Sequence, residues 1–162
     1  MNTPEAAQTL TNQYIDEIIV FNRAHNIVGR SSRQEITELD IKDAETILDH
    51  TKNQTRILDI GSGAGLPGII IAINQPWSQV VMSEKSKKKA YFIKKTIKAL
   101  GLKNAEVIDT AITPLTKNLE LFDTITARAL APSNHHSKNV HTAFNPKWNF
   151  FTYEGQKRNH NK

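Results

Sequence analysis

The spacing of apolar residues divides the chain into an N-terminal helical part and a longer part in which short apolar runs alternate with helices. Apolar and aromatic side chains recur every three or four residues from about residue 5 to 25, which is the period of one helix face. Pro4 suits the first turn of that helix. A polar loop over residues 26–34 contains Gly29 as a breaker, and the same period predicts a second helix from Gln34 to His50.

From residue 56 onward, five short apolar runs predict strands. They cover residues 56–60, 79–83, 105–108, 122–127 and 148–153. Helices are predicted over residues 66–74 and 86–100, with Gly101 just past the second, and a short helix around 136–144 is one interpretation of an ambiguous stretch. The alternation favours an α/β fold with a doubly wound, mostly parallel sheet, in which ligands bind beyond the carboxyl ends of the strands.

We expect this pattern to form a single domain, because the chain has 162 residues. Residues 1–54 would be a helical N-terminal extension and residues 55–155 the core. Residues 156–162 are polar and basic, and we expect them to form a disordered tail.

The turn after the first predicted strand carries the most specific motif in the chain. Asp59 precedes three glycines at alternate positions, Gly61, Gly63 and Gly65. Glycine lets the backbone adopt positive φ and lets a ligand approach the main chain closely. The acidic residue makes the loop a poor phosphate cradle, and it favours a cationic or hydroxyl-rich ligand such as S-adenosylmethionine.

Three interpretations of this loop compete. Residues 63–68 satisfy the G-x-G-x-x-G fingerprint of NAD-binding proteins, but Pro67 stands where the helix should offer free N–H groups to a pyrophosphate. Residues 59–65 satisfy the acidic-x-Gly-x-Gly-x-Gly pattern of methyltransferases. The third interpretation is a glycine-rich turn with no ligand. A P-loop is excluded, since no Gly-Lys-Ser/Thr follows the glycines.

Further candidate site residues lie at the carboxyl ends of the other predicted strands, which meet at one edge of a parallel sheet. Glu84 follows the second strand, where a carboxylate accepts hydrogen bonds from the ribose hydroxyls of NAD and S-adenosylmethionine alike. Asp109 follows the third strand, where it would contact adenine or cap a turn. Arg128 follows the fourth strand and would face the ligand, an RNA phosphate or a surface carboxylate.

Lysines crowd into the helix predicted over residues 86–100. Its apolar residues fall on one face, so the lysines line the outward side. This surface fits RNA, and a solvated helix face accounts for it nearly as well. The lysines are Lys85, Lys87, Lys88, Lys89, Lys94, Lys95 and Lys98.

Composition narrows the classes of function. The chain has no cysteine, so disulfides and thiolate metal sites are excluded, and His135 and His136 lack partners at metal-ligand spacing. A net charge of +5 favours an anionic partner, nucleic acid first. No apolar stretch reaches the roughly 18 residues of a membrane helix. The N-terminus also lacks a signal-peptide pattern, so we expect a cytoplasmic protein that does not bind a membrane. We also expect it to be a monomer and to bind no metal.

Residues 58–69, Leu-Asp-Ile-Gly-Ser-Gly-Ala-Gly-Leu-Pro-Gly-Ile, closely resemble the bacterial RsmG family, also known as glucose-inhibited division protein B. Leu-Pro-Gly directly after the third glycine is unusual among methyltransferases. Further similarity lies in residues 21–27, 84–93 and 126–129, and the resemblance covers roughly residues 8–156.

The resemblance implies a class I S-adenosylmethionine-dependent methyltransferase fold and methylation of guanine N7 in 16S ribosomal RNA or the small ribosomal subunit. It also implies roles for residues that spacing alone does not assign. Leu66 would join the glycines in the cofactor pocket, Ile112 and Thr113 would make backbone contacts after the third strand, and Arg128 would be the family's arginine. The expected cofactor site is Asp59, Gly61, Gly63, Gly65, Leu66, Glu84, Asp109, Ile112, Thr113 and Arg128, with Arg128 the single candidate for a catalytic role.

The chain departs from the family pattern at three places. The family's His-x-x-Asp segment is Asp40-Ile-Lys-Asp43 here, and its Lys-Gly after the fifth strand is Glu154-Gly155. The chain also stops several tens of residues before the family does, which would leave the fifth strand as an exposed edge. Two other hypotheses therefore stand beside the active methyltransferase: a shortened, catalytically impaired member that acts at most by binding RNA, and an NAD-dependent oxidoreductase.

Overall fold

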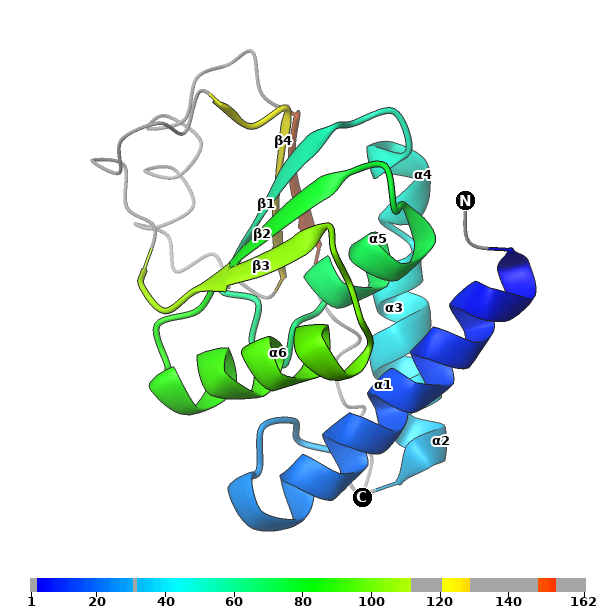
Figure 1. Cartoon of the computed structure of the whole chain (residues 1–162). Coiled ribbons are helices and arrows are strands. Elements are labelled where there is room, and N and C mark those ends of the chain that lie inside the picture. Colours follow the sequence, from blue (N-terminus) through cyan, green and yellow to red (C-terminus); the bar gives the residue numbers. More distant parts are fainter. Residues whose placement is uncertain (1–2, 31, 112–120, 129–148, 154–162) are drawn as a thin grey trace, which may run out of the picture.

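The described part of the computed structural model comprises residues 3–30, 32–111, 121–128 and 149–153. Within it, five parallel strands form one sheet in the order β3-β2-β1-β4-β5 (Figure 1). The strands are β1 (Arg56–Ile60), β2 (Gln79–Ser83), β3 (Ala105–Ile108), β4 (Thr124–Arg128) and β5 (Asn149–Tyr153). The strand order reverses between β1 and β4, which is where such sheets bind ligands. The predicted α/β fold class is confirmed.

Helix α1 (Pro4–His25) matches the predicted first helix closely. The Thr3 hydroxyl oxygen caps its start by accepting a hydrogen bond from the N–H of Ala6 at 3.2 Å. At its end, Asn26 takes the left-handed conformation with φ of 45°. Asn26 therefore caps the C-terminal end of the helix, and Gly29 follows in the loop.

The prediction of one continuous helix from Gln34 to His50 is wrong. This stretch forms α2 (Arg33–Glu35), a π-helix η1 (Ile36–Ile41), α3 (Lys42–Glu45) and, after a turn, α4 (Leu48–Thr51). The Thr37 hydroxyl donates to the Arg33 carbonyl at 2.9 Å, and the Thr46 hydroxyl donates to the Asp43 carbonyl at 2.7 Å. Such side-chain bonds compete with the regular helical ladder and bend helices, which explains the interruptions.

Helices α5 (Gly68–Asn74) and α6 (Lys87–Ala99) lie against one face of the sheet, and α1 packs outside them (Figure 1). One buried cluster joins all three helices to that face. It includes Tyr14, Ile15 and Ile18 of α1, Ile69, Ile70 and Ile73 of α5, Phe92 and Ile93 of α6, and Ile57, Val80 and Met82 of the sheet. The N-terminal helices thus share the core with the glycine loop. A smaller cluster on the opposite face holds Leu58, Ile60, Val81, Ile125 and Ala127.

Some predicted boundaries need correction. Helix α5 begins at Gly68 and not at residue 66, and β4 includes Arg128 as its last residue. The helix considered over residues 136–144, the tail 156–162, His135, His136 and Glu154-Gly155 lie outside the described residues. None of the described helices is both long enough and apolar enough to cross a membrane.

Candidate functional site

The loop between β1 and α5 is hydrogen-bonded to the end of β2. The backbone N–H groups of Gly61 and Ser62 donate to the Ser83 carbonyl at 2.8 and 3.1 Å. Gly61, Gly63 and Gly65 have φ of 68°, 60° and 94°, a conformation that residues with a Cβ rarely adopt. Backbone geometry therefore explains why glycine stands at each of the three alternate positions.

The glycines of this loop serve two different purposes. A Cβ built on Gly61 or Gly63 would meet no atom within 4 Å, so these two present bare backbone to open space. A Cβ on Gly65 would lie 2.7 Å from Ile69 Cγ1, and one on Gly68 would lie 2.5 Å from Met82 Cγ. Gly65 and Gly68 therefore let the loop pack on the core, while Gly61 and Gly63 leave room for a ligand.

Asp59 lies beneath the loop and is fully buried. Its carboxylate accepts hydrogen bonds from the Gly68 N–H at 3.2 Å and from the Thr126 hydroxyl at 3.0 Å. Burial raises the pKa of Asp59 to about 6, against the opposing effect of these and nearby hydrogen bonds. In this structure the carboxylate links the start of α5 to the middle of β4.

Glu84 follows β2 and holds the other side of the loop. Its side chain accepts from the Gly63 N–H at 2.9 Å with one oxygen and from the Ser86 N–H at 2.8 Å with the other. Only 7% of the residue is exposed. Each carboxylate oxygen has a second acceptor position, so Glu84 retains the capacity to accept hydrogen bonds from the hydroxyls of a bound ligand.

A cavity of about 310 Å³ opens beside the glycine loop. It lies among the glycine loop, the loop that follows α1, the π-helix and the end of β4. Its lining residues are Ile27, Val28, Gly29, Arg30, Asp40, Gly61, Ser62, Gly63, Ala64, Leu66 and Arg128. Of the residues predicted from the sequence, the structure therefore brings Gly61, Gly63, Leu66 and Arg128 together at one cavity.

The other predicted site residues occupy different places. Asp59 and Gly65 are buried below the loop, and Glu84 stands next to Gly63. Asp109 is exposed just after β3, and it does not line this cavity. Ile112 and Thr113 lie outside the described residues.

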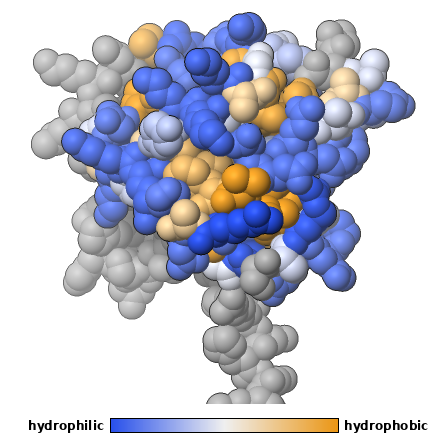
Figure 2. Space-filling view, turned by 60° about the horizontal axis from the view of Figure 1, so that its bottom comes forward, coloured by the Kyte–Doolittle hydropathy of each residue, from blue (hydrophilic) through white to orange (hydrophobic). Residues whose placement is uncertain are grey.

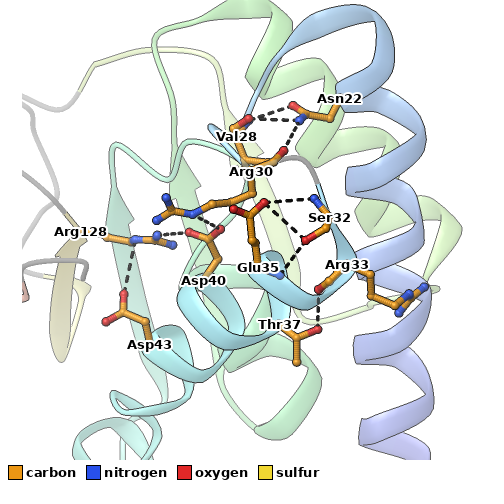
Figure 3. A network of polar contacts seen from close by, with 10 residues as sticks. All are labelled: Asn22, Val28, Arg30, Ser32, Arg33, Glu35, Thr37, Asp40, Asp43 and Arg128. Carbon is orange, nitrogen blue, oxygen red and sulfur yellow. Dashed lines mark hydrogen bonds and ion pairs between the residues drawn. The ribbon is translucent and has the colours of Figure 1, made fainter. Parts of the chain in front are cut away.

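Four charged side chains form an arginine–aspartate cluster, made of Arg30, Asp40, Asp43 and Arg128 (Figure 3), and all of them except Asp43 line the cavity. Asp40 Oδ2 lies 3.3 Å from Arg30 Nε, and Asp40 Oδ1 accepts a hydrogen bond from Arg128. Arg128 Nε also lies 3.6 Å from Asp43 Oδ2. Burial raises the pKa of Asp43, an effect that Arg128 opposes and Asp40 reinforces. Arg128 thus has carboxylate partners within the chain.

The end of α1 sets the position of Arg30. The Asn22 side-chain amide donates to the carbonyls of Val28 and Arg30 at 3.1 and 3.0 Å, and its oxygen accepts from the Val28 N–H at 3.1 Å (Figure 3). Ser32 and Glu35 form a capping box that starts α2 directly after this loop. Asn22 therefore folds the loop so that Arg30 lines the cavity.

Sequence reasoning missed Arg30 and Asn22 as site residues. Arg30 stands in a polar loop, and no pattern in a single sequence distinguishes it from a solvated arginine. Ser32-x-x-Glu35 is a capping-box signal that would have placed the helix start. Tyr14 is one of the apolar and aromatic residues that recur along the first helix, yet its hydroxyl also donates to the Ala64 carbonyl in the glycine loop at 2.8 Å. Among the described residues, no group of three or more histidines and carboxylates is arranged to hold a metal ion.

Comparison with known proteins gives a consistent family match. The family model described as GidB, rRNA small subunit methyltransferase G, matches residues 7–162. Proteins named ribosomal RNA small subunit methyltransferase G are similar to this chain in Nitrosospira multiformis (35% identity; 81% of this chain and 60% of that protein), Chromobacterium violaceum (30%; 75% and 58%) and Helicobacter pylori (33%; 91% and 82%). The chain spans about three-fifths of the length of the first two relatives.

Solved structures of low sequence identity share the fold. Coclaurine N-methyltransferase, bound in that crystal to N-methylheliamine and SAH, matches with a TM-score of 0.58 at 16% identity, over 91% of this chain and 49% of its own. The C-terminal domain of precorrin-6Y C5,15-methyltransferase from Rhodobacter capsulatus matches with a TM-score of 0.54 at 14% identity, over 67% and 59%. These comparisons give no support to the NAD-dependent oxidoreductase.

Proposed function

We propose that this chain, which belongs to the rRNA small subunit methyltransferase G family, binds S-adenosylmethionine and transfers its methyl group to N7 of a guanine in 16S ribosomal RNA. The observation that carries the proposal is the glycine loop. Gly61 and Gly63 present bare backbone to open space at the wall of a cavity, with Glu84 fixed beside them.

The residues present fit this cofactor. Glu84 is buried, fixed at both oxygens and still able to accept from ribose hydroxyls. Gly61 and Gly63 would let the cofactor lie against the main chain, and Leu66 would supply an apolar contact. Asp59 would act indirectly by holding the loop in place. Bound S-adenosylmethionine would supply an electrophilic methyl group.

Transfer to guanine N7 needs little proton chemistry from the chain. N7 carries a lone pair and no proton, so no general base is required. Asp40 is the one carboxylate among the described lining residues of the cavity, and two guanidinium groups already bind it. The chain would therefore act by positioning the guanine in line with the methyl group.

The arginine–aspartate cluster suits a base that becomes cationic on methylation. Arg30 and Arg128 carry positive charges, which Asp40 and Asp43 balance at the same wall. Two unpaired arginines would repel the new positive charge of the methylated base, and the paired ones do so much less. We assign Arg128 this electrostatic and positioning role.

The form of the substrate follows from where N7 lies. It faces the major groove, which in A-form RNA is too deep and narrow for side chains. The target guanine would therefore be presented by a loop, a distorted helix or an incompletely assembled subunit. We also propose that the chain acts as a monomer, which size-exclusion chromatography with light scattering would test.

Calorimetric titration with S-adenosylmethionine, with NAD in parallel, tests the cofactor site. We expect micromolar binding of S-adenosylmethionine, no binding of NAD, and loss of binding in Gly61→Arg. Gly101→Arg is the matched control, because Gly101 also has a positive φ, of 66°, and no atom within 4 Å of an added Cβ, but it does not line the cavity.

Methyl transfer from radiolabelled cofactor to undermethylated small ribosomal subunits then tests the reaction. A folded chain that binds no S-adenosylmethionine would overturn the proposal and favour a family member that acts by binding RNA alone.

A further inference from the structure

An exposed tyrosine on α6 is surrounded by lysines. Tyr91 is 63% exposed, and its neighbours on the helix surface at i−4, i−3, i+3 and i+4 are Lys87, Lys88, Lys94 and Lys95. All four lysines are exposed. We call these five residues the Tyr91 surface.

Folding alone does not account for this arrangement. The buried face of α6 consists of Ala90, Phe92, Ile93 and Thr96, and any polar residues would serve on the opposite face. Lysines in the first turn oppose the helix dipole, and that turn contains no acidic residue. Lys95 pairs with Glu17 of α1 at 2.6 Å, whereas no ion pair joins Lys87, Lys88 or Lys94 to a carboxylate in the described part of the chain.

Ring contacts join the Tyr91 surface to the end of α1. The Tyr91 ring lies 6.4 Å from the Phe21 ring of α1, and Phe21 lies 4.3 Å from the His25 ring, measured between centroids. His25 ends α1, and Ile27 two residues later lines the cavity. The rings therefore connect the lysine-rich part of α6 with the end of α1, two residues before a residue of the cavity lining.

The figures show the side of the molecule to which these two helices belong. Figure 1 shows α6 in the lower half of the molecule, with the C-terminal half of α1 below it. Figure 2 brings the bottom forward and shows a mostly hydrophilic face with an apolar area near its middle.

We propose that the Tyr91 surface binds a single-stranded segment of the substrate RNA next to the target guanine. One base would stack on the exposed ring of Tyr91, and the flanking phosphates would contact Lys87, Lys88 and Lys94. The inference rests on the proposed function for the identity of the RNA, and it adds where the RNA docks and that the docked segment is unpaired. A duplex would use the lysines but not the ring, because its bases are already stacked.

Fluorescence anisotropy with a labelled single-stranded oligoribonucleotide of about 12 nucleotides, and with the same sequence as a duplex, tests the stacking contact. We expect Tyr91→Ala to weaken single-strand binding about tenfold and to leave duplex binding unchanged. Tyr91→Phe keeps the ring and should bind like the unchanged chain. Both variants replace an exposed side chain, so circular dichroism should show unaltered folding.

The lysines are tested through the salt dependence of binding. Lys87→Gln, Lys88→Gln and Lys94→Gln together should lower the slope of log affinity against log salt by about 2, since each lost single-strand contact removes about 0.7. A control with Lys42→Gln, Lys52→Gln and Lys103→Gln loses the same charge from other exposed positions and should keep the slope.

Three results would overturn the inference: a Tyr91→Ala variant that binds the single strand normally, a ring-independent preference for duplex, or equal losses in the two lysine triples. These outcomes are independent of catalysis. Selective binding without methyl transfer would sustain the inference and refute the proposed function, whereas methyl transfer by the chain together with any of the three binding results above would do the reverse.

Discussion

The glycine loop and the arginine–aspartate cluster line the same cavity but are built in opposite ways. The loop comes from one continuous stretch, residues 59–68, and its shape follows from positive φ and close packing. The cluster comes from three stretches, and the Arg128–Asp40 hydrogen bond joins residues 88 positions apart. The loop is largely backbone, while the cluster is made of side-chain charges. One wall of the site is therefore a local structure, and the other exists only when the tertiary fold is complete.

This difference predicts where the site is most fragile. Removing the partner of a buried charge lowers the free energy of unfolding more than removing one contact of an uncharged loop does. Four substitutions, taken from the largest expected effect to the smallest, test that contrast.

Asp40→Ala should have the largest effect. The Asp40 side chain is 6% exposed and holds both Arg30 and Arg128, so its loss leaves two largely buried guanidinium groups without their shared carboxylate. We expect urea denaturation to show a loss of about 4 kcal/mol in the free energy of unfolding. Asp49→Ala is the control, since the Asp49 side chain is 92% exposed and lies 3.9 Å from Lys52, and it should change stability little. Equal effects of the two substitutions would show that the cluster is not a buried network.

Asp59→Asn should change the pH dependence of stability. The pKa of Asp59 is about 6 in the folded chain and about 4 in the unfolded chain, so the folded state holds a proton that the unfolded state releases in this window. The free energy of unfolding of the parent chain should therefore fall by about 3 kcal/mol, relative to that of the Asn variant, as pH rises from about 4 to about 6. The measurement is the difference in unfolding free energy between the two chains at each pH. A difference that does not vary with pH would contradict a raised pKa for Asp59 in the folded chain.

Gly68→Ala should cost about 2 kcal/mol, because its Cβ would overlap Met82 in a close-packed core. Gly29→Ala is the matched control, since Gly29 has no atom within 4 Å of the added Cβ and no positive φ. Thermal denaturation of the two variants compares them directly. If Gly29→Ala proved as costly as Gly68→Ala, packing would not be what selects glycine in the loop.

Tyr14→Phe should have the smallest effect, about 1 kcal/mol, because it removes the hydroxyl that donates to the Ala64 carbonyl while keeping the buried ring. The variant tests whether α1 stabilises the glycine loop from outside. Hydrogen exchange at the loop amides should rise in Tyr14→Phe more than exchange in β1. Unchanged exchange in the loop would show that the loop is self-sufficient.

The sequence by itself determined the parts of this protein that depend on local spacing. The three-to-four-residue period fixed α1 and α6, the short apolar runs fixed β1, β2 and β3, and the alternate glycines located the loop. These predictions succeeded because helix period, strand burial and glycine conformation are properties of neighbouring residues. The family resemblance rested on the same continuous motif, and the family match confirms it.

Only the tertiary structure decided which side chains meet at the cavity. Arg30, Asp40 and Arg128 come together because Asn22 folds one loop, a π-helix carries Asp40, and β4 pairs beside β1. The sequence also could not show that Asp59 lies beneath the glycine loop, because its hydrogen bond to Thr126 spans 67 positions. The local spacing of apolar residues does not predict such contacts, since their geometry depends on how separate elements pack against one another.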